Sequence, residues 1–276
     1  MDKPSPRQLL FGLHVDALTM REAVARCAEA IRTRQPLVVG VLNAAKIVNL
    51  RRDRTLRESL LTCDLMLADG QSVVWASRIL GRPLPERVTG IDLFEELLDL
   101  ADREHRSIYL LGARPEVLAA LRQRIADRWP GLSIAGSHHG YFRDSDAPAI
   151  AGRIAASGAD MLFLGMASPK KEIFLGRFGA GLGVPVLHGV GGSFDILAGL
   201  TRRAPLAWQK LGLEWAYRLL QEPRRLWKRY FVTNTSFIAL TLRELLRPSP
   251  AFATLGDAHP GQLRPRELAE QEPLSP

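Results

Sequence analysis

The sequence predicts an α/β fold of the Rossmann-like, layered type, with a mostly parallel sheet followed by a C-terminal helical appendage. Up to about residue 205, short apolar runs alternate with longer amphipathic runs, which is the pattern of strands joined by crossover helices. Beyond Pro205 the strand-like runs stop and helical periodicity continues. With 46% apolar residues, the 276-residue chain can bury a sizeable core.

The expected strands are the short apolar runs 37–42, 65–68, 107–112, 132–135, 161–165 and 184–188. The expected helices are the amphipathic runs 19–34, 44–52, 56–62, 72–80, 92–104, 115–129, 147–157 and 170–177, and a further helix starts at Ser193. The alternation is cleanest from Ser107 onward. We therefore expect one catalytic domain over residues 1–205, with two halves that meet near residue 105.

The C-terminal part is expected to hold one helix, 206–246, within an appendage of residues 206–247. Pro248 and Pro250 stop that helix, and the last 29 residues contain six prolines, so residues 248–276 are predicted to be a disordered tail. No internal repeat is present.

The basic charge is concentrated in one segment. The chain has a net charge of +8, and residues 201–230 hold eight Lys or Arg against two Glu, interleaved with three Trp and two Tyr. This combination is typical of a helix on an anionic membrane surface, with Arg218, Arg224 and Arg225 as candidates for membrane or diphosphate contacts. The alternative is a helix packed on the body with a solvated basic face.

The rest of the composition predicts a protein that is made and kept in the cytoplasm. Cys27 and Cys63 cannot form a disulfide framework, and the N-terminal segment lacks the apolar run of a signal peptide. No uninterrupted apolar run is long enough to span a bilayer.

Polar residues follow several of the expected strands, where ligands bind in open α/β sheets. Asp69 ends one such strand, where it can act as a general base or serve only in a turn or helix cap. Asn43 can bind a sugar hydroxyl or cap a helix. Arg87, Thr89 and Asp92 place a cation, a hydroxyl and a carboxylate at a helix start, which fits either a phosphate site or a variant capping box.

Glycines mark the ends of other strands and allow close backbone approach to a ligand. Gly189, Gly191 and Gly192 form the densest group and precede Asp195, which can cap a helix or bind a ribose or base. Gly112 precedes a helix that begins with Pro, and Gly165 precedes Lys170 and Lys171, which can neutralise a diphosphate or form a solvated surface run. The full G-x-G-x-x-G fingerprint is absent, which argues against a nicotinamide enzyme.

Metal binding is not expected. Asp144 and Asp146 form a D-x-D pair, but they follow a Gly-Tyr-Phe-Arg segment and read as a turn or helix cap. His138 and His139 have no further ligands at a suitable spacing.

Taken together, the motifs resemble the WecG/TagA/CpsF family of glycosyltransferases over roughly residues 10 to 230. The matching segments, in order, are Leu42-Asn-Ala-Ala, Asp53 through Arg57, Leu67-Ala-Asp-Gly70, Pro85 through Phe94, Tyr109-Leu-Leu-Gly112, His139-Gly-Tyr-Phe142, Gly165 with Ser168-Pro-Lys170, Gly189 to Asp195, Arg203-Ala-Pro205, and Gly212-Leu-Glu-Trp215 through Glu222-Pro-Arg-Arg225. No single segment is specific, but their order is.

The resemblance implies inverting, metal-independent transfer of a sugar from a UDP-sugar to a polyprenyl-diphosphate-linked saccharide in cell-surface polysaccharide assembly. It implies no cofactor, and it makes Asp69 the general base. The acceptor or sugar site then includes Asn43, Arg87, Thr89, Asp92 and Lys171. The nucleotide site includes Gly112, Gly165, Pro169, Lys170, Gly189, Gly191, Gly192 and Asp195, while Arg218, Arg224 and Arg225 match arginines of the family's membrane-contacting appendage.

Two positions depart from the family pattern. Val41 replaces a common Thr two residues before the motif Asn, and Lys171 replaces a common Gln. Both lie in segments expected near the sugar or acceptor, so the donor sugar does not follow from the resemblance. The expected partners are the UDP-sugar, the lipid-linked acceptor and an anionic membrane surface, with no nucleic acid and a possible homo-oligomer. Two rival functions remain, a nucleotide-dependent oxidoreductase or epimerase and a non-catalytic membrane-binding adaptor.

Overall fold

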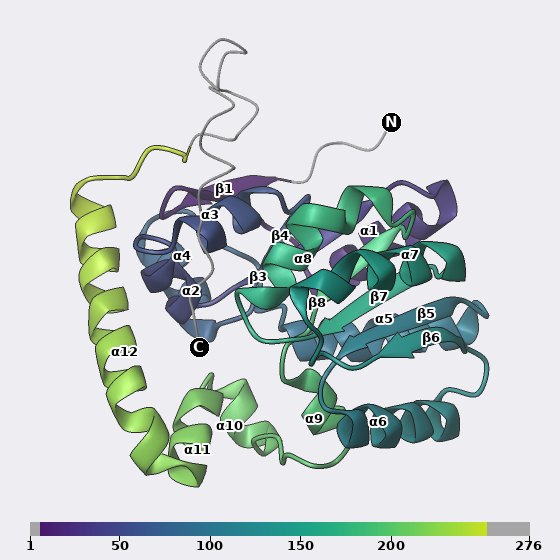
Figure 1. Ribbon diagram of the computed structural model, residues 1–276. Coiled ribbons are helices and arrows are strands. Elements are labelled where there is room, and N and C mark those ends of the chain that lie inside the picture. The colour runs from purple at the N-terminus through teal and green to yellow at the C-terminus, as the bar shows by residue number, and fades with distance from the viewer. Residues whose placement is uncertain (1–5, 253–276) are drawn as a thin grey trace.

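A computed structural model describes residues 6–252 of the chain (Figure 1). Its centre is a six-stranded sheet in the order β4-β3-β8-β7-β5-β6, and every neighbouring pair of strands is parallel. The strands are β3 (Leu37–Leu42), β4 (Leu65–Ala68), β5 (Ser107–Gly112), β6 (Ser133–His138), β7 (Met161–Gly165) and β8 (Val186–Gly189). The predicted α/β class with a parallel sheet is confirmed.

Helices cover both faces of this sheet, because its strands carry apolar side chains on both faces and each face must be buried. One face carries α1 (Met20–Thr33), α5 (Gly90–Arg103), α6 (Pro115–Arg128) and α9 (Ser193–Leu197). The other carries α2 (Ala44–Asn49), α3 (Arg54–Leu61), α7 (Ala147–Ser157) and α8 (Lys170–Phe178). The connecting segments include α4 (Gln71–Ile79) and two short 3-10 turns, η1 (Asp144–Asp146) and η2 (Gly179–Gly181).

Four of the predicted strands have the boundaries expected from the sequence, and the predicted helices of the body are present with ends that differ by at most three residues. Two strands differ more. β8 begins at Val186 because Pro185 has no N–H to donate, although its carbonyl accepts from Leu37. β6 extends to His138, past a register shift opposite Ile108 and Tyr109 that the sequence pattern does not reveal.

An antiparallel hairpin at the N-terminal end was not predicted. It consists of β1 (Arg7–Leu10) and β2 (Leu13–Asp16), joined by Phe11 and Gly12, which both have positive φ. Its four-residue strands are too short to give a clear alternating pattern. Asp16 anchors the hairpin to the sheet by accepting a 2.8 Å hydrogen bond from the backbone N–H of Met66.

The single C-terminal helix expected over 206–246 is wrong, because the segment forms three helices. These are α10 (Leu206–Lys210), α11 (Glu214–Gln221) and α12 (Pro223–Leu246). The first break is at Gly212, which has φ of 69°, and the second is at Glu222, just before Pro223. Glycine permits the left-handed turn, and proline is favoured at the first position of a new helix.

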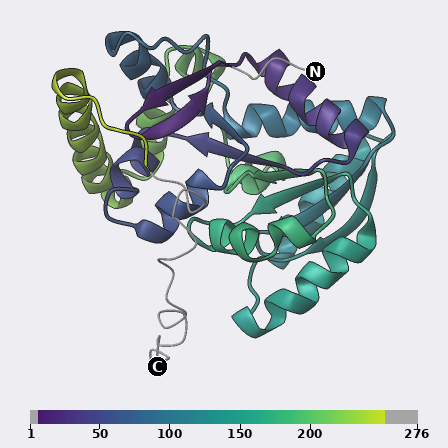
Figure 2. The ribbon, with the colours of Figure 1, turned by 90° about the horizontal axis from the view of Figure 1, so that it is seen from above.

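The long helix α12 stands against the β4 edge of the body, beside α2 and the N-terminal hairpin (Figures 1 and 2). Phe237 packs on Phe11 with ring centroids 5.5 Å apart. The start of the predicted disordered tail is ordered here, since the backbone N–H of Phe252 donates to the carbonyl of Gly12 at 2.8 Å and Ser249 donates to Glu244. Residues 253–276 of the predicted tail lie outside the described residues.

Candidate active site

The carboxyl edge of the sheet contains a point where the chain turns in opposite directions from neighbouring strands. The connection after β5 runs through α6 on one face, and the connection after β7 runs through α8 on the other. Gly112 and Gly165 meet at this point, where a Cβ on Gly112 would lie 2.4 Å from the carbonyl carbon of Gly165. Ligands of open α/β sheets bind at such switch points.

Asp69 follows β4 at the same edge, and its carboxylate is held by hydrogen bonds from two elements. The side-chain amide of Asn43 donates to Oδ2 at 3.3 Å, and the backbone N–H of Gly90 donates to Oδ1 at 3.0 Å. Asn43 is also the N-cap of α2, because its Oδ1 accepts from the N–H of Lys46. Capping therefore fixes the amide that orients Asp69, and the sugar-binding role of Asn43 stays a prediction.

Thr89 is the N-cap of α5, and Asp92 is the third residue of this helix. The Thr89 hydroxyl accepts from the N–H of Asp92 at 3.1 Å and donates to its Oδ2 at 2.6 Å. This is half of a capping box, because the Asp92 carboxylate does not reach the N-cap N–H. Its other oxygen pairs with Nη1 of Arg203 at 2.5 Å.

Arg87, Glu214, Arg203 and Asp92 form a continuous chain of alternating charges, which we name the clamp. Glu214, the first residue of α11, binds Nη1 of Arg87 through Oε2 at 2.7 Å and Nε of Arg203 through Oε1 at 3.2 Å. Burial alone would raise the pKa of the Asp92 carboxyl, but the bonds from Arg203 and Thr89 outweigh it and hold that pKa below its ordinary value. The clamp therefore joins the appendage to the start of α5.

The appendage also touches the Asp69 segment directly. A Cβ on Gly212 would lie 2.5 Å from the side chain of Gln71, two residues beyond Asp69. Arg218 and Arg224 are exposed on α11 and α12, and Arg225 pairs with Glu222 through two contacts, of 2.6 and 3.0 Å. The three arginines are thus on the appendage surface rather than among the Asp69 contacts.

The glycine turn after β8 leaves space at the strand end. Added Cβ atoms at Gly192 meet nothing within 4 Å, and Gly191 needs its positive φ of 56°. Asp195 lies in the first turn of α9, where its carbonyl accepts from Leu200 and Thr201. Gly165 has a packing role as well, because a Cβ there would lie 2.3 Å from the ring of Phe194.

The segment after β7 sends its two lysines in different directions. Pro169, which follows a cis peptide bond, is the N-cap of α8. The Lys170 ammonium donates to the carbonyls of Gly140 and Phe142 at 2.9 and 3.0 Å and lies 4.0 Å from the Phe142 ring centroid, so it ties down the loop after β6. Lys171 is buried and turns instead over Gly189 toward Glu172.

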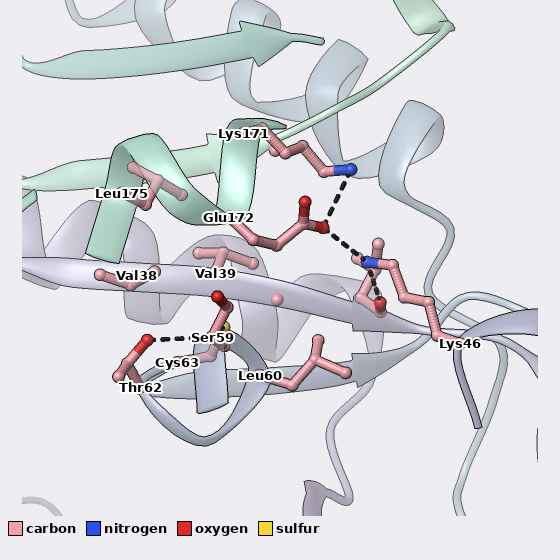
Figure 3. Close-up of a pocket in the computed structure, with 13 residues that line it drawn as sticks. Val38, Val39, Lys46, Ser59, Leu60, Thr62, Cys63, Lys171, Glu172 and Leu175 are labelled. Atoms are coloured by element: carbon pink, nitrogen blue, oxygen red, sulfur yellow. Dashed lines mark hydrogen bonds and ion pairs between the residues drawn. The ribbon is translucent and has the colours of Figure 1, made fainter. Parts of the chain in front are cut away.

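Lys46, Lys171 and Glu172 meet on the α2 and α8 face of the sheet, at one end of a cavity that extends down to Cys63 (Figure 3). Burial, with repulsion from Lys171, lowers the pKa of Lys46, although Glu172 and Asp69 oppose this shift. Burial would raise the pKa of Glu172, but the two lysines outweigh it and lower that pKa. Burial raises the pKa of the Cys63 thiol to about 12, so Cys63 is neutral.

His188 is fully buried on the opposite face, beneath Asp69's partner Gly90. Its Nε2–H donates to the carbonyl of Gly90 at 3.0 Å, and its Nδ1 has no hydrogen-bond partner within residues 6–252. Burial lowers the pKa of His188 to about 4. Since Gly90 binds Asp69 through its N–H and His188 through its carbonyl, the neutral imidazole helps to fix the residue that positions the carboxylate.

Several of these residues carried no assigned role in the sequence. Lys46, Glu172, His188, Arg203 and Glu214 each lie within a few residues of a strand end or a glycine turn. That proximity was the available signal, but only the fold shows that they meet. The D-x-D pair lies on the exposed turn η1, and no group of three or more potential metal ligands occurs within residues 6–252.

A parallel sheet with a fixed carboxylate, glycine turns and basic side chains at its carboxyl edge defines an α/β enzyme of the doubly wound class. The family model of the Glycosyl transferase WecG/TagA/CpsF family matches residues 8–251. The chain therefore belongs to this family, and it is a glycosyltransferase of cell-surface polysaccharide biosynthesis. The resemblance seen in the motifs is confirmed, and it extends through α12.

Proposed function

We propose that the protein is an inverting, metal-independent glycosyltransferase of the hexosyl or N-acetylhexosaminyl type. It moves a sugar from a UDP-sugar to a polyprenyl-diphosphate-linked saccharide at the inner face of the plasma membrane. The observation that carries this proposal is the Asp69 carboxylate, which is fixed by Asn43 and Gly90 at the carboxyl edge of the sheet. Both oxygens retain a lone pair for an incoming hydroxyl.

In the proposed reaction, Asp69 takes the proton of the acceptor hydroxyl as that oxygen attacks the anomeric carbon of the donor. The new carbon–oxygen bond forms on the side opposite UDP, and the bond to the UDP oxygen breaks, with its electron pair leaving on the diphosphate. A single displacement of this kind inverts the anomeric centre. General-base assistance accounts for a rate factor of about 10²–10⁴.

The leaving diphosphate needs positive groups that are already in place. The arginines of the appendage are suitable groups, because cations stabilise developing charge strongly in a site that excludes water. In the turn after β8, the N–H groups of Val190 and Gly191 already donate to the carbonyl of Leu164. The clamp supports this arrangement by holding α11 beside the Asp69 segment.

The appendage also has the character of a membrane-contacting surface. Along α12 a buried stripe of Leu226, Phe237, Thr241 and Glu244 faces the body. On the remaining surface, seven large apolar side chains are 50–81% exposed: Trp227, Phe231, Val232, Ile238, Leu242, Leu245 and Leu246. Exposed Arg224, Lys228 and Arg229 flank their N-terminal end. Such a helix fits the interface of an anionic leaflet. In residues 6–252, no helix has the length and hydropathy needed to cross a bilayer.

The reaction is tested by UDP release from a panel of UDP-sugars, with a prenyl-diphosphate-linked monosaccharide as acceptor and EDTA present. We expect release with one donor, and we expect Asp69→Asn to lower kcat by about 10²–10⁴. The matched control is Asp144→Asn, which changes an exposed aspartate on η1 and should keep wild-type turnover. Near-full turnover of Asp69→Asn would contradict the assigned base. Absence of UDP release with every donor, together with absence of UDP-sugar binding, would favour a non-catalytic membrane-binding adaptor.

Membrane association is tested by sedimentation with liposomes that contain anionic lipid. Each basic residue near such a surface contributes about 1 kcal/mol, so Arg224→Gln with Arg225→Gln should weaken binding by roughly 30-fold. The control replaces two exposed arginines of α6, Arg122→Gln with Arg124→Gln, and should bind like the wild type. Equal loss in both double variants would show that net charge, and not the appendage, is responsible.

A further inference from the structure

The cluster of Lys46, Lys171 and Glu172 contains two ammonium groups and one carboxylate. Oε1 of Glu172 lies 3.1 Å from Nζ of Lys171 and 3.7 Å from Nζ of Lys46. All three side chains are at most 14% exposed. A buried charge is costly unless it is paired, so an arrangement with two cations around one anion lacks one negative group.

Several hydrogen-bonding groups of the cluster also lack partners in the part of the chain that the structure describes. Neither carboxylate oxygen of Glu172 has a hydrogen-bond partner of good geometry within residues 6–252. Lys46 donates one bond to the carbonyl of Val41 at 2.8 Å, and an ammonium group has three donors. The other nearby groups do not pair with the two lysines: Cys63 is neutral, and Asp69, whose charge opposes the lowering of the Lys46 pKa, forms no ion pair with either lysine within residues 6–252.

The position of the cluster places it at the ligand-binding edge of the sheet. Lys46 reaches the end of β3, and the aliphatic chain of Lys171 crosses the end of β8, where a Cβ on Gly189 would lie 2.9 Å from its Cδ. In Figure 3 the two ammonium groups point to each side of the Glu172 carboxylate, at the opposite end of the drawn residues from Val38 and Leu175. The apolar end of the cavity cannot pair them.

We propose that Lys46 and Lys171 bind an anionic oxygen group of the donor substrate, which supplies the second negative charge that Glu172 alone does not provide. This inference rests on the proposed function, because it assumes a nucleotide-sugar donor at the same edge of the sheet. The chemistry is that of a carboxylate or phosphate oxygen meeting two ammonium groups. Two parts of a donor carry such oxygens: a carboxylate on the sugar, or the diphosphate.

The test measures binding by isothermal titration calorimetry, so it needs no acceptor. The ligands are uridine, UDP, UDP-glucose and UDP-glucuronate, of which the last two differ by a carboxylate. The principal variant is Lys171→Gln. Its matched control is Arg177→Gln, which removes one positive charge from an exposed position of the same helix. Thermal unfolding of both variants checks that they are folded.

A sugar carboxylate as the bound group predicts that Lys171→Gln weakens UDP-glucuronate binding about 10-fold or more and leaves UDP and UDP-glucose unchanged. The diphosphate as the bound group predicts an equal loss for UDP and both UDP-sugars, with uridine unaffected. In either case Arg177→Gln binds all four ligands like the wild type.

A second variant, Glu172→Gln, is expected to change the affinity for the anionic ligand in the opposite direction. It also covers the case in which Lys171→Gln does not fold. Removing the only carboxylate of the cluster leaves both lysines without an anion, so the affinity for the same anionic ligand should rise. Wild-type affinities in both variants would overturn the inference and leave the proposed function intact. A wild-type protein that binds neither UDP nor the UDP-sugars would overturn the proposed function, and the inference with it.

Discussion

The two charged clusters at the carboxyl edge of the sheet differ in how completely their charges are paired. In the clamp, Glu214 binds both Arg87 and Arg203, and Arg203 also binds Asp92, so two cations meet two carboxylates. In the second cluster, two lysines share the single carboxylate of Glu172. The balanced charges of the clamp hold the protein's own parts together, whereas the unbalanced charges of the lysine cluster can bind an anionic ligand.

Two neighbouring residues of β8, His188 and Gly189, lie on the sides of the sheet that face the two clusters. His188 turns toward α5 and the peptide of Gly90, next to the clamp, while Gly189 lies under Lys171 on the α8 side. Successive residues of a strand point to opposite faces of a sheet, so one short segment supports both arrangements. The predictions that follow test whether the clamp side is structural and the lysine side is for ligand binding.

The largest effect is expected at His188, through its titration. Its folded-state pKa is about 4, below the ordinary value of 6.5, so the unfolded chain binds the proton first as the pH falls. The stability of the neutral form is fully present above pH 6.5 and is lost progressively down to pH 4, by about 3 kcal/mol in all. Urea unfolding across this range measures the slope.

The variant His188→Gln keeps a donor for the Gly90 carbonyl and removes the titration, so this part of the slope should disappear. The control is His14→Gln, which changes an exposed histidine of β2 and should retain it. A full slope in His188→Gln would mean that other groups cause the acid sensitivity.

The next effect concerns the clamp. Arg203→Met leaves Asp92 and Glu214 without their shared cation, so α11 should shift away from the Asp69 segment. A displacement of catalytic groups by about 1 Å costs on the order of 10²-fold in rate. We expect kcat/KM to fall by that order while the affinity for UDP changes little. Steady-state kinetics and calorimetry separate the two, and Arg202→Met, at the exposed neighbouring position, is the control.

The smallest effect is expected at Gly189. In Gly189→Ala the new methyl group would meet the Lys171 side chain at 2.9 Å, and a flexible side chain can yield to it at moderate cost. The variant should weaken binding of the anionic donor about threefold, in the direction of Lys171→Gln, because the displaced lysine keeps its charge but not its position. Gly176→Ala, at an exposed position of α8 where the new methyl group meets no atom within 4 Å, should not. Equal affinities in both variants would separate Gly189 from the lysine cluster.

The sequence predicted much of the fold because its signals are local. Four strands had the correct bounds, and the apolar runs of β3, β4, β5 and β7 are uninterrupted because those strands are buried on both faces. The same locality limits the prediction. The break at Gly212 falls within continuous helical periodicity, and the start of α12 depends on a proline that suits the first turn of a helix as well as a stop.

The sequence alone determined the α/β class and, through the order of its motifs, the family, because each motif consists of residues close together in the chain. The role of Asp69 as the base is implied by that family resemblance and stays a prediction. Only the tertiary structure decided how the charges pair. Glu214 lies 127 residues from Arg87, and Lys46 and Glu172 come from different helices. Interactions between charges depend on distance and burial, and neither quantity is encoded in a local pattern of residues.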